Sequence, residues 1–203
     1  MRALRLLADR EVGLVDLPSP PPPAADEVRL RVLAVALNHI DVWGWRGMAF
    51  AKRSLPLTVG AEAVAVVEAV GTNVTSVKVG QRVVPYAAIT CGTCRFCRRG
   101  EDNLCENPSG VRGFHLDGFA QELINHPARL VVPVPDGVEN TDAACVSVAY
   151  ATVEHMLFDN ARLEPGETVL VHAGGSGIGT IAIRIAHSLG CTCLLYTSDA
   201  ADD

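Results

Sequence analysis

The sequence predicts an α/β fold class in two parts: a β-rich, barrel-like domain over residues 1–140 and the start of a doubly wound α/β domain over residues 141–192. Two observations carry this prediction. Short apolar stretches separated by Gly and Pro turns dominate the first part, as in small β domains. The second part contains a helical pattern, a short apolar run, a glycine-rich turn and an amphipathic helical pattern, in that order.

The strands of the first part are predicted from side-chain alternation and from β-branched residues. Residues 27–33 alternate charged and apolar side chains with the period of a half-buried strand. The proline-rich run at 18–23 predicts a rigid extended connector, although such a run can also be the ligand of a partner protein. Further strands are expected at residues 63–70, 77–84, 118–124 and 129–134.

The second part is predicted to begin with a helix that Thr141 caps and that ends near Leu157. Residues 168–173 form a short apolar run typical of a buried parallel strand. A second helix follows the glycine-rich turn and ends at Gly190. Its apolar face is expected to consist of Ile178, Ile181, Ala182, Ile185 and Leu189.

Residues 193–203 differ in character from the rest of the chain. Their sequence resembles the translation of a sequencing adapter, which would make them an artefact outside the fold. The alternative is a genuine second strand. A doubly wound domain needs more strands than these residues can supply, so we expect a C-terminally truncated fragment that is itself inactive.

Composition excludes several classes of function. The net charge of −6 argues against a nucleic-acid-binding surface. No apolar run approaches the roughly 18 residues of a membrane span, and no signal-peptide core follows the N-terminus. We therefore expect a soluble, cytoplasmic protein without nucleic-acid or membrane partners.

Four of the seven cysteines, Cys91, Cys94, Cys97 and Cys105, lie close together in the chain. Thiolates at this spacing can bind one tetrahedral zinc ion, and four sulfurs leave no position for water or substrate. The predicted ion is therefore structural, and it would stiffen a lobe over about residues 91–106. An iron–sulfur cluster usually has its fourth cysteine after three residues. Two disulfides would need an oxidising compartment.

The glycine-rich turn between strand and helix predicts a dinucleotide site. Such a turn lets the backbone approach a pyrophosphate, whose oxygens face the free N–H groups at the helix N-terminus. The alternative is a turn that only packs the strand against the helix. The residue that selects NAD or NADP cannot be identified. The predicted cofactor-binding residues of this turn are Gly174, Ser176, Gly177, Ile178 and Gly179.

These motifs together resemble the medium-chain dehydrogenase/reductase superfamily, specifically its zinc-binding alcohol dehydrogenase-like and quinone oxidoreductase-like proteins. The resemblance implies a GroES-like β-barrel catalytic domain, the first βα unit of a Rossmann domain, and NAD(P)-dependent hydride transfer. It also implies a full-length homodimer or homotetramer. The motifs that carry it are residues 38–41, 60–62, 79–83, 118–122 and 173–179, with the four cysteines.

The sequence departs from zinc alcohol dehydrogenases at the ligands of their catalytic zinc. The three positions hold Asn38, Ala61 and Val148, and Cys145 lies three positions from the last of them. These side chains do not provide the three ligands of an open zinc site. We expect Cys145 to be a buried small apolar side chain.

The resemblance to zinc-free quinone reductases, which share an Asn-x-x-Asp motif, implies roles for several residues. Asn38 would lie near the substrate oxygen or the nicotinamide, and Asp41 would order the surrounding groups. The alternative for both is structural hydrogen bonding in a strand-to-helix turn. His39 would contact the cofactor pyrophosphate, and Thr152 the nicotinamide. We expect Glu62 to have only a buried, hydrogen-bonding role.

The sequence therefore predicts an NAD(P)H-dependent oxidoreductase with one structural zinc ion that reduces a quinone, an enone or another carbonyl compound. One alternative is a zinc-dependent alcohol dehydrogenase with an alcohol substrate. A second is a non-catalytic structural or partner-binding protein on the same scaffold.

Overall fold

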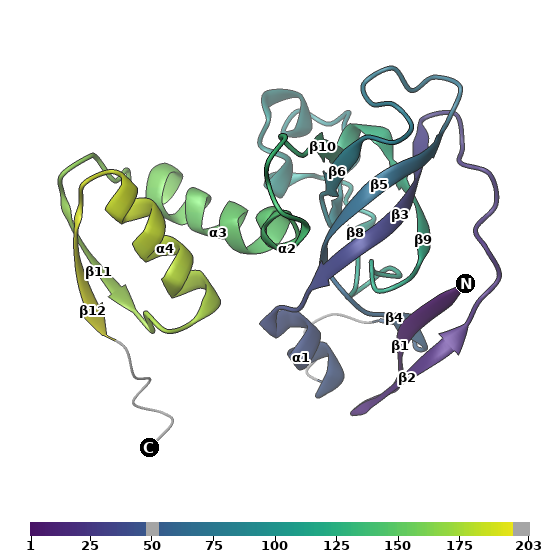
Figure 1. Cartoon of the computed structure of the whole chain (residues 1–203), viewed down its shortest axis with the longest axis horizontal. Helices are drawn as coiled ribbons and strands as arrows, with labels where there is room; N and C mark the ends of the chain where they lie inside the picture. The colour runs from purple at the N-terminus through teal and green to yellow at the C-terminus, as the bar shows by residue number, and fades with distance from the viewer. Residues whose placement is uncertain (48–52, 197–203) are drawn as a thin grey trace. The chain divides into compact units, whose positions relative to one another are not determined.

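The structure is a computed structural model of the chain, and it describes residues 1–47 and 53–196 (Figure 1). The chain divides into two compact units, Met1–Ser147 and Val148–Asp203. The helix α2 (Asn140–Ala143), which follows the boundary expected at residue 140, belongs to the first unit. No helix in the described ranges is both long and apolar enough to cross a membrane.

The first unit contains two main antiparallel sheets. The larger sheet has the order β10 (Val131–Pro133), β6 (Arg82–Pro85), β5 (Glu62–Val70), β3 (Glu27–Ala36) and β9 (Leu123–Pro127). In this sheet β3 lies between β5 and β9, as Figure 1 shows. The smaller has the order β2 (Glu11–Asp16), β1 (Arg2–Ala8) and β4 (Leu57–Thr58), and β7 (Ala88–Ile89) pairs with β8 (Gly110–Val111).

The sheets do not close into a barrel over the described residues, which corrects the barrel-like expectation for this domain. The edge strands β10 and β9 of the larger sheet end at Pro133 and Pro127. A proline has no N–H group, so it cannot extend a hydrogen-bonded ladder. The unit is therefore a pair of open sheets.

The alternation at residues 27–33 and the β-rich stretch at 63–70 predicted the central strands well. β3 and β5 cover the expected ranges 27–33 and 63–70 and extend beyond them. The expected strand at 77–84 is wrong in its first half, because Gly80 adopts a positive φ of 83° and the chain turns there. Residues 118–122 are not a strand either, and β9 begins at Leu123.

The helical segment after residue 139 differs from its prediction. Glu139, and not Thr141, is the N-cap of α2, because Ala143 N donates to Glu139 O. The segment also continues past Leu157 to Asn160. It comprises α2, the π-helix η4 (Val146–Tyr150), α3 (Ala151–Glu154) and the π-helix η5 (His155–Asn160).

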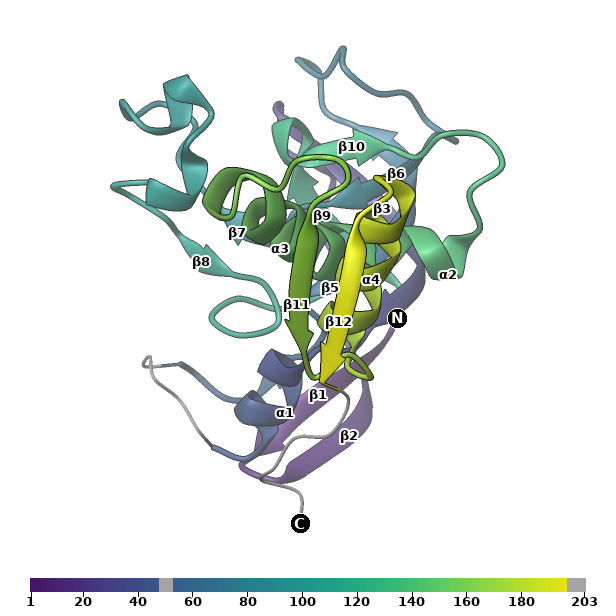
Figure 2. The same cartoon turned by 90° about the vertical axis from the view of Figure 1, so that its left-hand side faces the viewer.

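The second unit contains a βαβ element (Figure 2). β11 (Thr168–His172) and β12 (Thr192–Tyr196) are parallel, and α4 (Gly177–Ser188) connects them. The helix lies along the strand pair in Figure 2, and it buries Ile181, Ala182 and Ala186. Gly190 ends the helical segment with a φ of 71°, as predicted.

The strand β11 is parallel, as expected, but it is only partly buried. Val171 packs in the core with α4, while Leu170 is 58% exposed. Adjacent residues of a strand point to opposite faces, and α4 covers one face of this two-stranded sheet. Cys193–Tyr196 of the suspected adapter sequence pair with β11, and residues 197–203 lie outside the described residues.

Candidate functional site

The four clustered cysteines lie on the loop between β7 and β8, which includes the short 3-10 helices η1 (Cys97–Arg99) and η2 (Asp102–Leu104). Their sulfur atoms all lie within 4.8 Å of one another. Cys97 Sγ is 3.9 Å from Cys91 Sγ and 3.5 Å from Cys94 Sγ. Zinc–sulfur bonds of about 2.3 Å in a tetrahedron place the sulfurs about 3.8 Å apart. The cluster therefore fits one structural zinc ion.

Backbone N–H groups surround these sulfurs. Thr93 N and Cys94 N donate to Cys91 Sγ at 3.4 and 3.3 Å, and these hydrogen bonds lower the pKa of Cys91 to about 6. Burial and the neighbouring thiols instead raise the pKa of Cys97 to about 12. Four thiolates so close together repel one another, and a divalent cation compensates for this repulsion.

The cysteine lobe has no core of its own. No residue from Cys91 to Ser109 is fully buried. Phe96, the one aromatic side chain there, is covered by the guanidinium groups of Arg95 and Arg99 at 4.7 and 5.2 Å. The fold of this lobe therefore depends on its sulfur cluster rather than on apolar burial.

A second group of polar residues surrounds the N-terminus of α1 (His39–Trp45), of which Asn38 is the N-cap. Asn38 Nδ2 donates to Glu62 Oε2 at 2.9 Å. Glu62 is fully buried at the start of β5, so the buried hydrogen-bonding role expected for it is confirmed. The strand β3 presents Asn38 at its exit, and β5 presents Glu62 beside it, because Ala36 pairs with Glu62.

Asp41 joins two backbone segments at this place. Its Oδ2 accepts from Asn38 N at 2.9 Å, and its Oδ1 accepts from Gly60 N at 3.0 Å. Burial raises the pKa of Asp41, although these backbone hydrogen bonds act in the opposite direction. The carboxyl group therefore holds the start of α1 against the turn that precedes Glu62.

Two other residues near this group bear on its chemistry. Ala61 occupies the middle of the Gly-Ala-Glu motif, and its methyl group is buried. Cys145 is partly buried, its Sγ lies 3.5 Å from Thr141 O, and burial followed by the charges of Glu62 and Asp142 raises its pKa.

The glycine-rich turn in the second unit passes from strand to helix as its sequence predicts. Ser176 is the N-cap of α4, and its Oγ accepts from Gly179 N at 3.0 Å. A side chain at Gly179 would lie 2.3 Å from Ala173 O, so only glycine fits there. Gly177 and Ile178 form the first turn of the 12-residue helix, where backbone N–H groups attract anions.

Of the remaining cofactor-binding candidates, His39 and Thr152 are exposed and Gly174 is buried. His39 is exposed on α1, and its ring centroid lies 6.1 Å from that of Trp43. Thr152 is exposed on α3 in the second unit. Gly174 is buried, and Thr180 Oγ1 donates to its carbonyl at 3.4 Å.

Over residues 1–47 and 53–196, the four cysteines form the one group of three or more His, Cys, Asp or Glu side chains that lie close enough together to hold a metal ion.

Sequence reasoning missed a loop that supports the Asn38 group. Gly113 and Gly118 approach the backbone of Gly60 so closely that a Cβ at either would lie 2.4–2.7 Å from Gly60 atoms. Asp117 accepts a hydrogen bond from Thr58 N, two residues before Gly60. The only signal in the sequence was the Asp-Gly pair directly before the Phe-Ala-Gln-Glu run.

Residues 24–136 match the family model described as the alcohol dehydrogenase GroES-like domain. An alcohol dehydrogenase of Geobacillus stearothermophilus is 35% identical over 165 residues, which cover 81% of this chain and 48% of that protein. An acryloyl-coenzyme A reductase of Sulfurisphaera tokodaii is 30% identical over 178 residues, which cover 88% of this chain and 53% of that protein.

A solved structure of a cobalt- and zinc-bound thermostable alcohol dehydrogenase from Pyrobaculum aerophilum is similar in fold. Its TM-score is 0.86 at 30% identity, and the match covers 96% of this chain and 59% of that one. The chain thus spans about half the length of these relatives.

Proposed function

Because the chain belongs to the zinc-type medium-chain dehydrogenases and reductases, we propose that it is the catalytic-domain part of an NAD(P)-dependent reductase of quinones, enones or related carbonyl compounds. The nicotinamide supplies the hydride, and the protein binds and orients the substrate. The relative named acryloyl-coenzyme A reductase supports a conjugated carbonyl as the substrate class.

The hydrogen bond between Asn38 and Glu62 is the observation that carries this proposal. The Asn38 amide nitrogen is engaged by a fully buried carboxylate, so the direction of the side chain is set. An amide so held is suited to orient a substrate oxygen or the cofactor carboxamide through hydrogen bonds. Neither this amide nor the methyl group of Ala61 belongs to the usual ligands of a catalytic zinc ion.

Asp41 has a supporting role in this proposal. Its two oxygens accept from Asn38 N and Gly60 N, which holds the N-cap of α1 in place. Catalysis depends on such preorganisation, because groups that are already oriented need not reorganise during the reaction. We assign substrate orientation to Asn38 and the positioning of Asn38 to Asp41.

The glycine-rich turn of the second unit would bind the cofactor. Gly174, Ser176, Gly177, Ile178 and Gly179 supply a tight turn and free N–H groups suited to a pyrophosphate. His39 would add a polar contact to the pyrophosphate, and Thr152 would pack against the nicotinamide. The four cysteines would hold a structural zinc ion that takes no part in the reaction.

A zinc-dependent alcohol dehydrogenase is the second candidate. The features that favour it are Cys145, which lies three positions from the expected third ligand, and the buried carboxylate of Glu62, since cysteine and carboxylate groups are zinc ligands. The relative from Geobacillus stearothermophilus is itself named alcohol dehydrogenase.

Metal analysis of a protein that carries this chain at the full length of its relatives separates the two candidates. The reductase should bind about one zinc ion per chain, and the alcohol dehydrogenase about two. NADH or NADPH oxidation is then measured with a quinone, an enone and an aldehyde, for the wild type and for Asn38→Ala. A second equivalent of zinc with unchanged activity of Asn38→Ala would refute the proposed function.

A further inference from the structure

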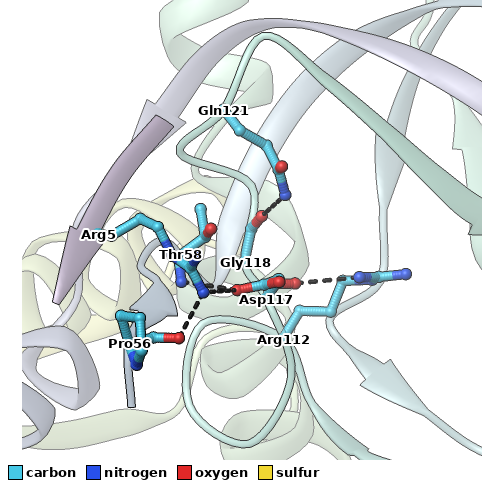
Figure 3. Close-up of polar contacts among 7 residues, drawn as sticks. All are labelled: Arg5, Pro56, Thr58, Arg112, Asp117, Gly118 and Gln121. Atoms are coloured by element: carbon cyan, nitrogen blue, oxygen red, sulfur yellow. Dashed lines mark hydrogen bonds and ion pairs between the residues drawn. The ribbon is translucent and has the colours of Figure 1, made fainter. Parts of the chain in front are cut away.

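Asp117 lies where the loop before β9 meets β4 in the first unit (Figure 3). Its Oδ1 accepts from Thr58 N at 2.8 Å. The next residue, Gly118, donates its N–H to Thr58 O at 2.8 Å. Two consecutive residues of the loop therefore form hydrogen bonds with the backbone N–H and C=O groups of Thr58, which is itself fully buried.

The contact between these two segments continues toward the candidate site. Phe119 N donates to Gly60 O at 2.8 Å, and Ala120 N donates to Val59 O at 2.9 Å. The segments are in van der Waals contact, since a Cβ at Gly118 would lie 2.4 Å from Gly60 O. A displacement of the loop must therefore displace Gly60, because there is no free space between them.

The opposite side of Gly60 faces the candidate site. Gly60 N donates to Asp41 Oδ1 at 3.0 Å, and Glu62, two residues further on, accepts from Asn38 Nδ2. One continuous series of short contacts thus runs from Asp117 through Thr58 and Gly60 to the amide of Asn38.

Two arginines hold Asp117 in this position. Arg5 Nη2 lies 3.3 Å from Asp117 Oδ1 and also donates to Pro56 O. Arg112 Nη1 donates to the backbone oxygen of Asp117 at 3.0 Å from the other side, as Figure 3 shows. Arg112 is itself anchored, because its Nε donates to the buried His126 Nδ1 at 3.0 Å.

We propose that Asp117 is a positioning residue for Asn38: its carboxylate fixes the Thr58–Gly60 backbone, and this backbone sets the directions of Asp41, Glu62 and the Asn38 amide. The inference rests on the proposed function only for its catalytic consequence. Asp117 does not contact the Asn38 side chain, so its effect is transmitted through the turn at Gly60.

The chain offers a matched control in Glu122. Its carboxylate also accepts one backbone N–H, from Arg2 at 3.0 Å, and also pairs with an arginine side chain, Arg2 Nε at 3.1 Å. The two carboxylate side chains are exposed to a similar extent: 47% of the Glu122 side chain and 50% of the Asp117 side chain are accessible to solvent. Removing either carboxylate deletes the same types of interaction, but only Asp117 bonds to the Thr58–Gly60 segment.

The experiment compares nitrogen–proton NMR spectra of the wild-type chain, Asp117→Ala and Glu122→Ala. Asp117→Ala should shift the Asn38 side-chain amide and the Gly60 backbone amide, and Glu122→Ala should leave both unchanged. Asp117→Asn keeps an acceptor oxygen at the same distance from the backbone. In this variant the Asn38 and Gly60 signals should lie close to their wild-type positions. Equal effects of the two alanine variants, or unchanged Asn38 and Gly60 signals in Asp117→Ala, would overturn the proposal.

If Asp117→Ala does not fold, the NMR spectrum of Asp117→Glu tests the proposal instead. This variant keeps the ion pair with Arg5 but moves the acceptor by one methylene, so the Asn38 signal must shift, and an unshifted signal overturns the proposal. In a protein that carries this chain at the full length of its relatives, Asp117→Ala should lower kcat about tenfold or more with little change in KM. The NMR result does not depend on hydride transfer. Full activity of Asn38→Ala would therefore refute the proposed function and leave the positioning role standing.

Discussion

The side-chain amide of Asn38 donates to Glu62 Oε2 at 2.9 Å, across 24 residues of sequence. Glu62 is fully buried, and Asn38 lies at the N-cap of α1, where β3 ends. Burying a carboxylate is unfavourable unless hydrogen-bond donors replace its water. This pair therefore links the stability of the first unit to the geometry of the candidate site.

Replacement of Asn38 by alanine should destabilise the first unit. The variant removes a hydrogen bond to a buried carboxylate, and such bonds contribute roughly 1.5–3 kcal/mol. Urea unfolding monitored by Trp43 and Trp45 fluorescence measures the change. Asn107→Ala, at an exposed position of the cysteine lobe, is the control and should stay within about 0.5 kcal/mol of the wild type. A double-mutant cycle with Glu62→Gln should give a coupling energy above about 0.5 kcal/mol, and simple additivity would contradict the assigned contact.

Replacement of Cys97 by serine should abolish zinc binding, because the remaining three thiolates no longer close a tetrahedral site. Zinc per chain, measured by elemental analysis, should fall from about one to near zero. The lobe has no buried core, so limited proteolysis should then cut between β7 and β8. Cys145→Ser, which removes a thiol outside the cluster, should retain the full zinc content. Retained zinc in Cys97→Ser would contradict the four-sulfur site.

The buried His126 should make the first unit less stable in acid. Burial, followed by the charges of Arg112 and Arg129, lowers the pKa of His126 from 6.5 to about 3. Between these values the unfolded chain binds one proton more than the folded chain. The free energy of unfolding should therefore fall as the pH drops from about 6.5 toward 3, by about 1.4 kcal/mol per pH unit from this group.

Urea unfolding at several pH values measures this slope. His126→Gln removes the titrating ring but keeps a hydrogen-bond acceptor for Arg112, so its stability should depend less on pH over the same range. Asn107→Gln, a substitution at an exposed position that does not titrate, is the control and should keep the wild-type slope. An unchanged slope in His126→Gln would show that other groups cause the acid sensitivity.

Replacement of Gly179 by alanine should destabilise the second unit and disturb the turn before α4. The added Cβ would lie 2.3 Å from Ala173 O, which is backbone and cannot rotate away. Overpacking of this kind typically costs about 1–3 kcal/mol. Gly177→Ala is the matched control, since nothing lies within 4 Å of its Cβ position, and it should be neutral or stabilising by up to about 1 kcal/mol. Thermal unfolding by circular dichroism compares the two variants, and equal melting temperatures would contradict the close approach.

Local spacing alone was sufficient to predict two features of this protein. The four cysteines converge because they lie on one short loop, so their spacing restricts where the sulfurs can go. The passage from β11 through the glycine turn into α4 is equally local, since Ser176 caps a helix that begins at the next residue. Alternation predicted β3, and the run of β-branched and small apolar residues predicted β5, whose first four residues are all buried.

The register between distant strands decided the rest. Asp117 and Thr58 are 59 residues apart, and no local pattern indicates that one accepts a hydrogen bond from the other. Three other departures from the predictions also appear only in the structure. The larger sheet stays open at β9 and β10, β6 begins only at Arg82, and the helical segment after Glu139 includes π-helical turns.

The sequence by itself predicted the family, the clustering of the four cysteines and the passage from strand through a glycine turn into helix. The cysteine cluster and the turn could be predicted because each is formed by residues close together in the chain. Only the tertiary structure decided that Asn38 faces Glu62, that Asp41 holds Gly60, and that the loop at Asp117 supports them. Such contacts depend on strand pairing and on the space left between backbones, and these are properties of the packed chain as a whole.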